Sequence, residues 1–258
     1  MTDPGFDLTG RRALVTGASA GIGAAIAARL AGAGARVVAV SRSGGVPAVE
    51  RPSATGGRIA PLVADLADPT QVDTVVDRAV AELGGLDILV NNAGRGDWRP
   101  FGELDRGYFD ALIGLNLWSP LRISQLAHPH LAASSAGVVV MIGSVDAVRP
   151  SAGAVVYGAS KAGLAAATVA LAKEWMDDAI RVVQVDPGIV DTPMASQLLP
   201  QLEAAGFGVN LVRRAGRSDE IAGLVHYLVS PLGGFATGVS FRLDGGAVAI
   251  GPFDLRDR

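Results

Sequence analysis

The stretch Ala13-Leu14-Val15-Thr16-Gly17-Ala18-Ser19-Ala20-Gly21-Ile22-Gly23 joins a short aliphatic run to a helical pattern through a turn rich in glycine. The run at 13–16 is typical of a buried strand, and the pattern at 21–32 is typical of a helix. A glycine-rich turn at this position brings the backbone N–H groups at a helix start close to a phosphate group. The spacing Gly-x-x-x-Gly-x-Gly differs from the commoner Gly-x-Gly-x-x-Gly of dinucleotide sites. A merely flexible turn is the alternative interpretation.

Strand and helix patterns alternate along the rest of the chain. Further strands are predicted at 36–40, 59–64, 87–90, 137–142, 180–185 and 239–243. Further helices are predicted at 70–83, 108–126, 153–176 and 219–228, the last with Ser218 as its N-cap. This alternation predicts βαβ units and a parallel sheet. We therefore expect an α/β fold, a single domain over residues 1–258 whose doubly wound parallel sheet has about seven strands and helices on both faces.

Two segments interrupt this alternation. Residues 43–57 contain Pro47, Pro52 and four glycines, so we expect no regular helix there. Residues 191–217 form a long connection without a strand pattern. Connections of this length in a compact domain are usually lids or binding loops, and we expect this one to bind substrate.

Composition excludes several classes of function. A formal net charge of −3 gives no basic surface for nucleic acid. The absence of cysteine excludes disulfides, thiolate nucleophiles and cysteine-bound metals, and it fits a reducing compartment such as the cytoplasm. No uncharged apolar run reaches ~18 residues, so no membrane span is expected. His128-Pro129-His130 lacks a third ligand nearby in the sequence, so we predict no metal site.

Tyr157 and Lys161 are four residues apart in Tyr-Gly-Ala-Ser-Lys, thirteen residues after Ser144. Residues at this spacing share one face of a helix. A free tyrosine has a pKa near ~10, and a nearby positive charge lowers that pKa. Ser144 could then hold the oxygen that gains or loses a proton. An incidental pair on a surface helix is the alternative, but the chain has only three tyrosines and two lysines, Lys161 and Lys173.

Several motifs follow one another in a characteristic order. They are the turn at 16–23, Asn91-Asn92-Ala93-Gly94, Asn116, Ser144, Tyr157, Lys161 and Pro187-Gly188. In order and spacing the chain resembles the short-chain dehydrogenase/reductase family from about residue 8 to residue 249. The resemblance implies a Rossmann fold and an enzyme that transfers a hydride between a nicotinamide and a carbonyl or alcohol carbon.

The resemblance also implies roles for individual residues. Tyr157 would be the general acid in reduction and the general base in oxidation. Lys161 would bond the nicotinamide ribose and lower the pKa of Tyr157, and Ser144 would hydrogen-bond the substrate oxygen. Asn116 would hold a water that links Lys161 to solvent. The predicted catalytic residues are Ser144, Tyr157, Lys161 and Asn116.

The cofactor is expected to lie along the glycine turn and the ends of the strands. Asp65 would meet the adenine amino group, and the segment after Pro187 would face the nicotinamide carboxamide. The predicted cofactor-binding residues are Gly17, Ser19, Gly21, Ile22, Gly23, Ser41, Arg42, Ser43, Asp65, Leu66, Asn92, Ala93, Gly94, Tyr157, Lys161, Pro187, Gly188, Ile189 and Thr192.

The end of the second strand decides between the two nicotinamide cofactors. An acidic residue there would bond both ribose hydroxyls and repel a 2′-phosphate. This chain instead has Ser41, Arg42 and Ser43. Because a guanidinium pairs well with phosphate, we predict NADP(H) rather than NAD(H). A solvated surface arginine is the alternative interpretation of Arg42.

Two residues depart from the family pattern. Asp186 precedes Pro187 where the family more often has asparagine, and Gly143 precedes Ser144 where a second serine is frequent. Neither change removes a reacting group. The short 43–57 segment departs further and suggests an open adenine pocket.

The substrate pocket mixes apolar surface with charge of both signs. Its predicted residues are Arg95, Trp98, Ser144, Asp146 and Met194, with Arg149, Gly188, Leu198, Leu199 and Phe207 as further candidates. A small ketone or secondary alcohol is the expected substrate. A reductase of carrier-bound 3-oxoacyl groups and a non-catalytic dinucleotide-binding regulator are the alternatives. The resemblance suggests a homotetramer, or a homodimer, that pairs through the helices beginning near residues 108 and 153.

Overall fold

The computed structural model describes residues 4–47 and 56–250. Within them a single parallel sheet has the strand order β3-β2-β1-β4-β5-β6-β7. The strands are β1 (Arg12–Thr16), β2 (Arg36–Ser41), β3 (Arg58–Val63), β4 (Ile88–Asn91), β5 (Val138–Ile142), β6 (Arg181–Pro187) and β7 (Val239–Leu243). The order reverses between β1 and β4, which creates the crevice where doubly wound sheets bind ligands. The predicted α/β fold is confirmed.

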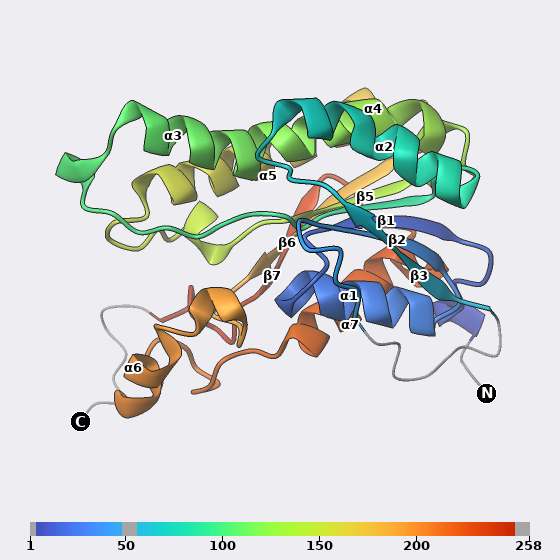
Figure 1. Ribbon diagram of the computed structural model, residues 1–258. Helices are drawn as coiled ribbons and strands as arrows, with labels where there is room; N and C mark the ends of the chain where they lie inside the picture. The colour runs from blue at the N-terminus through green and yellow to red at the C-terminus, as the bar shows by residue number, and fades with distance from the viewer. Residues whose placement is uncertain (1–3, 48–55, 251–258) are drawn as a thin grey trace.

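Helices cover both faces of the sheet (Figure 1). One face carries α1 (Gly21–Gly32) and α7 (Ser218–Val229), and the other carries α2 (Pro69–Leu83), α4 (Ser119–Ala132) and α5 (Val155–Glu174). The helix α3 (Arg106–Ile113) leads into α4, and the short α6 (Leu199–Ala204) lies away from the sheet.

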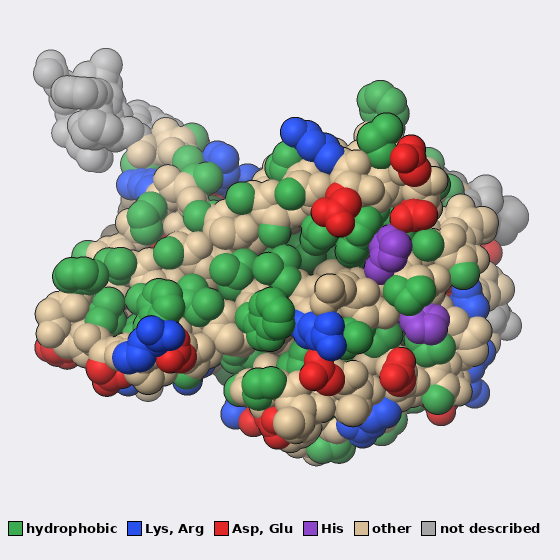
Figure 2. All heavy atoms as spheres, turned by 90° about the horizontal axis from the view of Figure 1, so that it is seen from above, with side chains coloured by type: hydrophobic (Ala, Val, Ile, Leu, Met, Phe, Trp, Pro, Cys, Tyr) green, Lys and Arg blue, Asp and Glu red, His purple; other side chains and the backbone are tan. Residues whose placement is uncertain are grey.

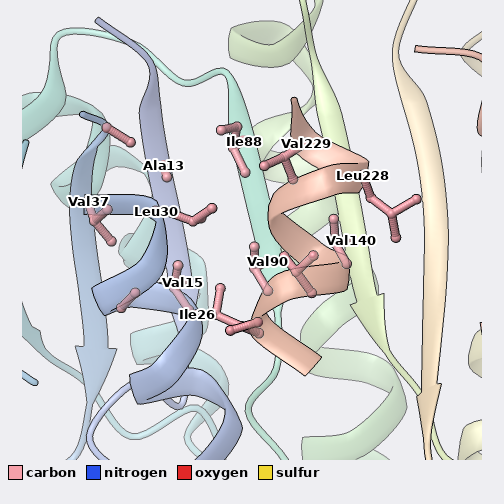
Figure 3. Close-up of a cluster of buried hydrophobic side chains, with 14 of the residues drawn as sticks. Ala13, Val15, Ile26, Leu30, Val37, Ile88, Val90, Val140, Leu228 and Val229 are labelled. Carbon is pink, nitrogen blue, oxygen red and sulfur yellow. The ribbon is translucent and has the colours of Figure 1, made fainter. Parts of the chain in front are cut away.

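The core has one layer on each face because successive strand residues point in opposite directions. Val15 packs with Ile26 and Leu30 of α1, whereas its neighbour Leu14 belongs to the layer under α2 and α4. Figure 3 shows the first layer, in which side chains of α1 and α7 meet those of the central strands. Burial on both faces explains why the strands are continuous aliphatic runs without alternation. Each fully buried valine, leucine or isoleucine contributes about 1.5–3 kcal/mol.

Two predictions about helix ends are wrong. The helix predicted at 108–126 consists of α3, a π-helical turn (η3, Gly114–Trp118) and α4, which continues through Pro129 to Ala132. Next to this proline, His128 lies 2.8 Å from Asp178 and packs against Trp175. Ser218 is the first residue of α7 and not its N-cap; the N-cap is Arg217, whose N–H donates to Glu220 at 2.7 Å.

The helix α5 is, among the described residues, the one that is long and apolar enough by length and composition to cross a membrane. Its Leu164 and Ala172 pack in the core layer beside the sheet, and Thr168 is fully buried. These positions are those of a core helix.

The two irregular segments differ in how much can be described. Residues 48–55 of the 43–57 segment lie outside the described residues, and its described residues form no helix. The 191–217 segment contains a 3₁₀ turn (Pro193–Ala195) and α6. Its ends are joined, because Asp191 N donates to Gly216 O and Gly216 N to Ile189 O, both at 2.9 Å. The segment is therefore a closed surface loop; that it binds substrate stays a prediction.

Candidate active site

The predicted site residues lie where parallel strands end. The glycine turn follows β1, Asn92 to Gly94 follow β4, Ser144 follows β5, and Gly188 follows β6. The carboxyl ends of parallel strands meet at one edge of the sheet, so these four segments share that edge.

The glycine turn is packed too tightly for other residues. Gly17 and Gly21 have φ values of +65° and +55°, which side chains rarely adopt. A Cβ atom at Gly17 would lie 2.8 Å from the Cα of Ala93. A Cβ atom at Gly23 would overlap the Gly17 carbonyl and the Asn92 amide. Backbone conformation therefore requires glycine at positions 17 and 21, and the close approach of neighbouring atoms requires it at positions 17 and 23.

Thr16 fastens this turn to the end of β4, a role that the site prediction missed. Its hydroxyl accepts the N–H groups of Asn92, at 2.9 Å, and Ala93, at 3.0 Å. The Asn92 side chain donates in return to the carbonyls of Thr16 and Gly17. Thr16 is a polar residue at the end of a buried strand, and this feature of the sequence could have indicated its role.

The start of α1 fits a phosphate group. Among the described residues no side chain caps this helix, whose N-cap is Ala20. The N–H groups of its first turn, at the positive end of the helix dipole, are thus open to an anion. Thr192 reaches the same turn, since its methyl carbon lies 3.0 Å from where a Cβ of Gly21 would be. The segment predicted to bind the phosphates of a dinucleotide is therefore in contact with the segment predicted to face its nicotinamide.

The end of β2 carries no acidic side chain. The hydroxyl of the buried Ser41 accepts the N–H of Gly44 at 3.1 Å, and that of the exposed Ser43 accepts the N–H of Gly45 at 3.3 Å. Ser19, Arg42 and Ser43 line a surface hollow. Further along this edge, Asp65 accepts the N–H of Ala67 at 3.0 Å, and Leu66 is buried.

Tyr157 is buried, with 8% of its surface exposed. The Ser144 hydroxyl accepts the N–H of Asp146 at 3.1 Å. Burial raises the pKa of Tyr157 to about 12; the Ser144 hydroxyl lowers this pKa and the charges of Asp146 and Asp186 raise it. The phenol is therefore protonated at neutral pH.

Lys161 is buried one helical turn after Tyr157. Its ammonium donates to the Ile142 carbonyl at 2.8 Å and lies 5.8 Å from the centre of the Tyr157 ring. Burial lowers the pKa of Lys161 to about 8, against the charge of Asp186, which raises it. Desolvation of the phenol is the largest effect on the pKa of Tyr157 in this structure. That Lys161 lowers this pKa stays a prediction.

Asn116 lies in the π-helical turn between α3 and α4, a local distortion that is frequent at functional sites. Its side chain makes two hydrogen bonds with the Arg95 backbone: Oδ1 accepts Arg95 N at 2.9 Å, and Nδ2 donates to Arg95 O at 2.8 Å. A Cβ at Gly94 would lie 3.1 Å from Asn116 Oδ1 and 3.7 Å from Lys161 Nζ. Gly94 thus separates Asn116 from Lys161, and a side chain there would contact both.

Two predicted pocket residues meet above Tyr157. The Trp98 and Tyr157 ring centres are 5.7 Å apart. A Cβ at Gly96 would lie 2.7 Å from the Trp98 ring and 3.2 Å from the Met194 sulfur, so these side chains adjoin.

The other pocket candidates are placed differently. The buried Asp146 accepts the N–H of Ser151 at 2.7 Å and braces its own loop. The guanidinium of Arg95 lies 3.7 Å from Asp97, and that of Arg149 donates to the Ala247 carbonyl. Gly188 lies against Asp244, Leu198 and Leu199 lie at the start of α6, and Phe207 is buried in the loop.

Two residues of β6 complete the site and were not predicted as part of it. Asp186 is buried and accepts a hydrogen bond from the Gln184 side chain at 2.7 Å. A Cβ at Gly143 would overlap the Asp186 carboxylate. The two departures from the family pattern, Gly143 and Asp186, therefore belong to one structural feature. The residues before them, Ile142 and Val185, are paired between β5 and β6, so the strand register links the two positions.

Comparison with known proteins identifies the family. The family model described as short chain dehydrogenase matches residues 11–203. The chain belongs to the short-chain dehydrogenase/reductase family, whose members are NAD(P)-dependent oxidoreductases.

Similar proteins cover nearly the whole chain. A 3-oxoacyl-[acyl-carrier-protein] reductase of Thermotoga maritima is 32% identical over 93% of this chain and 99% of its own. A short chain dehydrogenase of Burkholderia cenocepacia, solved in complex with NADP, is 38% identical with a TM-score of 0.83, covering 93% of this chain and 99% of its own. The L-sorbose reductase of Gluconobacter frateurii, solved with NADPH and L-sorbose, is 28% identical with a TM-score of 0.86, covering 95% and 99%.

Proposed function

We propose that this enzyme is an NADP(H)-dependent oxidoreductase of small ketones and secondary alcohols, with Tyr157 as the general acid and base. The observation that carries the proposal is that Ser144, Tyr157 and Lys161 are all buried at one site, with Lys161 one turn further along α5 and its Nζ 5.8 Å from the centre of the Tyr157 ring. A hydroxyl pair of this kind can hold a carbonyl oxygen and deliver a proton to it.

The direction that the site favours at neutral pH is reduction. The raised pKa of Tyr157, about 12, keeps the phenol protonated and ready to donate to the substrate oxygen. Ser144 would hold that oxygen, and Lys161 would bond the nicotinamide ribose. The bound dinucleotide would supply the hydride in reduction and accept it in oxidation. Trp98 and Met194 would bound the substrate on the open side of Tyr157.

The choice of NADP(H) over NAD(H) rests on the end of β2. Arg42 and Ser43 are exposed and line a surface hollow with Ser19, and no acidic residue opposes a 2′-phosphate there. The solved neighbours that contain NADP or NADPH support the choice.

A reductase of carrier-bound 3-oxoacyl groups is the second candidate. It is supported by the Thermotoga maritima relative, which aligns over 99% of its length. Activity on a free ketone as against a thioester separates the two. A regulator without turnover is disfavoured, because Ser144, Tyr157 and Lys161 are all present.

The proposed homotetramer would pair through the layer that contains α3 and α5. Figure 2, which views the molecule from this side, shows hydrophobic side chains gathered between charged ones. The exposed ones on α3, the π-helical turn and α5 are Phe109, Trp118, Val155 and Val169. The small side chains of α5 would allow close approach of two helices. Of these residues, Ala162 and Ala166 are exposed, whereas Gly163 faces Leu117 of its own chain. Light scattering that returned a monomer mass would contradict this assembly.

Two further expectations complete the proposal. The 191–217 loop, joined at its ends and carrying Met194, is suited to close over substrate. The cysteine-free composition favours the cytoplasm.

The proposed function is tested with a panel of ketones, secondary alcohols and 3-oxoacyl thioesters, each with NADPH or NADP⁺ and with NADH or NAD⁺, followed by nicotinamide absorbance. We expect turnover on at least one ketone, with NADPH preferred. No turnover on any ketone, or a preference for NADH, would contradict the corresponding part of the proposal.

A further inference from the structure

The site contains a buried carboxylate that the proposed chemistry does not use. Asp186 is 3% exposed and accepts a hydrogen bond from the Gln184 side chain at 2.7 Å. Burial raises the pKa of this carboxyl, whereas the Gln184 bond, the nearby Ser144 backbone N–H and the charges of Arg242 and Lys161 lower it. Neighbouring N–H donors favour the charged form of a carboxylate.

Gly143 leaves room for this carboxylate. Gly143 N donates to Val185 O at 2.7 Å, which holds the two strand ends together. The Asp186 carboxylate and the Gln184 amide then occupy the space where a side chain at 143 would extend. The carboxylate therefore lies beside Gly143, which joins the end of β5 to Ser144.

Lys161 reaches the same segment from the opposite direction. Its ammonium donates to Ile142 O, one residue before Gly143, so Asp186 and Lys161 meet the chain at adjacent positions. The charged or titratable groups around the pair are Tyr157 on α5, Asp146 in the turn after Ser144, and Arg242 on β7. Arg242 pairs with Asp186 along the strands but is exposed.

Gln184 connects Asp186 to the helix that carries the proton-transfer residues. Its Oε1 accepts from the Thr168 hydroxyl on α5 at 3.5 Å, while its Nε2 donates to Asp186. All three side chains are buried. The connection therefore runs from α5 through β6 to the backbone of Ser144.

We infer that Asp186 is a positioning residue, which holds the Ser144 backbone in place and supplies the buried negative charge that accompanies the Lys161 ammonium. The inference rests on the proposed part of Ser144 and Lys161 in proton transfer. It explains why Asp186 and Gly143 occur together in this chain.

The test is the titration of Lys161 in the free enzyme, which needs neither cofactor nor substrate. The chain has only two lysines, Lys161 and Lys173, so NMR of protein labelled with ¹³C at lysine Cε gives two signals, assigned with Lys173→Arg. In the wild type we expect Lys161 to titrate near pH 8. In Asp186→Asn we expect a midpoint lower by ~1 pH unit, the effect of losing an opposite charge nearby.

The exposed Asp191 provides the matched control, since Asp191→Asn removes a carboxylate five residues further along the chain. This change should leave the Lys161 midpoint unmoved. An unchanged midpoint in Asp186→Asn would overturn the inference. An enzyme inactive on every ketone would contradict the proposed function, but the titration would still be measurable.

A second pair of variants covers the case in which Asp186→Asn does not fold. Gly143→Ala should lower the unfolding midpoint of the wild type, because its methyl group meets the Asp186 carboxylate. In an Asp186→Ala background the same change should lower it less, since the carboxylate, which is the nearest group to the added methyl, is then absent and the Gln184 amide has lost the partner that fixes it. An equal decrease of the unfolding midpoint in both backgrounds would show that Gly143 is not needed to make room for Asp186, and would overturn this part of the inference.

Discussion

The Trp98 indole lies against the Tyr157 phenol, with ring centres 5.7 Å apart and ring planes inclined by 43°. Tyr157 is almost fully buried, whereas Trp98 is 45% exposed. The indole therefore covers the reactive phenol on one side while its other surface remains open to an incoming molecule. This arrangement suits the Tyr157 phenol to proton transfer and the Trp98 indole to substrate contact.

Replacing Trp98 should affect binding more than chemistry. Trp98→Ala removes an aromatic contact worth about 0.5–1.5 kcal/mol. We expect KM for a good ketone to rise several-fold and kcat to change less, in steady-state kinetics at saturating NADPH. Trp98→Phe keeps a ring and should lie between the two. A fall in kcat as large as that of Tyr157→Phe would mean that Trp98 has a part in the chemical step.

Arg42 should decide the cofactor. Arg42→Ala should weaken NADPH binding by about 1.5–3 kcal/mol, the range for a charge-assisted hydrogen bond, and leave NADH binding nearly unchanged. Fluorescence titration of each dinucleotide measures both. Arg106→Ala, which removes an exposed arginine bonded to Asp110 on α3, is the matched control. Equal weakening of NADPH and NADH by Arg42→Ala would disprove the assignment.

The two directions of reaction should differ in pH dependence. Reduction uses the protonated phenol, whose pKa is raised to about 12, so the titration of Tyr157 should leave its rate unchanged between pH 6 and 9. Oxidation uses the phenolate, whose fraction rises about tenfold per pH unit below the pKa. The kcat for alcohol oxidation should therefore climb steadily to pH 9 and beyond. A plateau in oxidation below pH 8 would contradict the raised pKa.

Cofactor affinity should report on Lys161. Its ammonium, with a pKa lowered to about 8 by burial, is charged below that pH and neutral above it. Because the ammonium is assigned to the ribose, the Kd for NADPH should increase as pH rises through 8. In Lys161→Met the Kd should be higher throughout and lose this step. A wild-type Kd that stays constant from pH 7 to 10 would remove Lys161 from cofactor binding.

Most of the fold could be predicted from the sequence because strands buried on both faces have a strong aliphatic pattern. The buried strand Val138–Ile142 begins one residue after its predicted start and ends where predicted, and the helix Gly21–Gly32 has its predicted bounds. The π-helical turn around Asn116 was not predictable, since its conformation depends on tertiary bonds to Arg95. The N-cap at Arg217 was missed for a related reason: Glu220 supplies the capping contact from within the helix.

The positions of site residues were predictable where a motif fixes the residue type. Their pKa values were less predictable, because these depend on burial and on neighbouring charges. The glycine turn and the Ser144, Tyr157 and Lys161 positions lie together as the motifs indicated. Helical spacing brought Lys161 next to Tyr157 but could not show that burial of the phenol dominates its pKa. The link between Asp186 and Gly143 required the register of β5 and β6, which a single sequence does not display.

The most direct test of the proposed function is the turnover of Tyr157→Phe on the best ketone with NADPH. The substitution removes the ionisable hydroxyl and keeps the ring that contacts Trp98. We predict a fall in kcat of about 10²–10⁴, the usual contribution of a positioned acid–base group, with NADPH affinity and the unfolding midpoint close to wild type. Near-normal turnover in this variant would contradict the assignment of Tyr157 and leave the family's fold without the proposed chemistry.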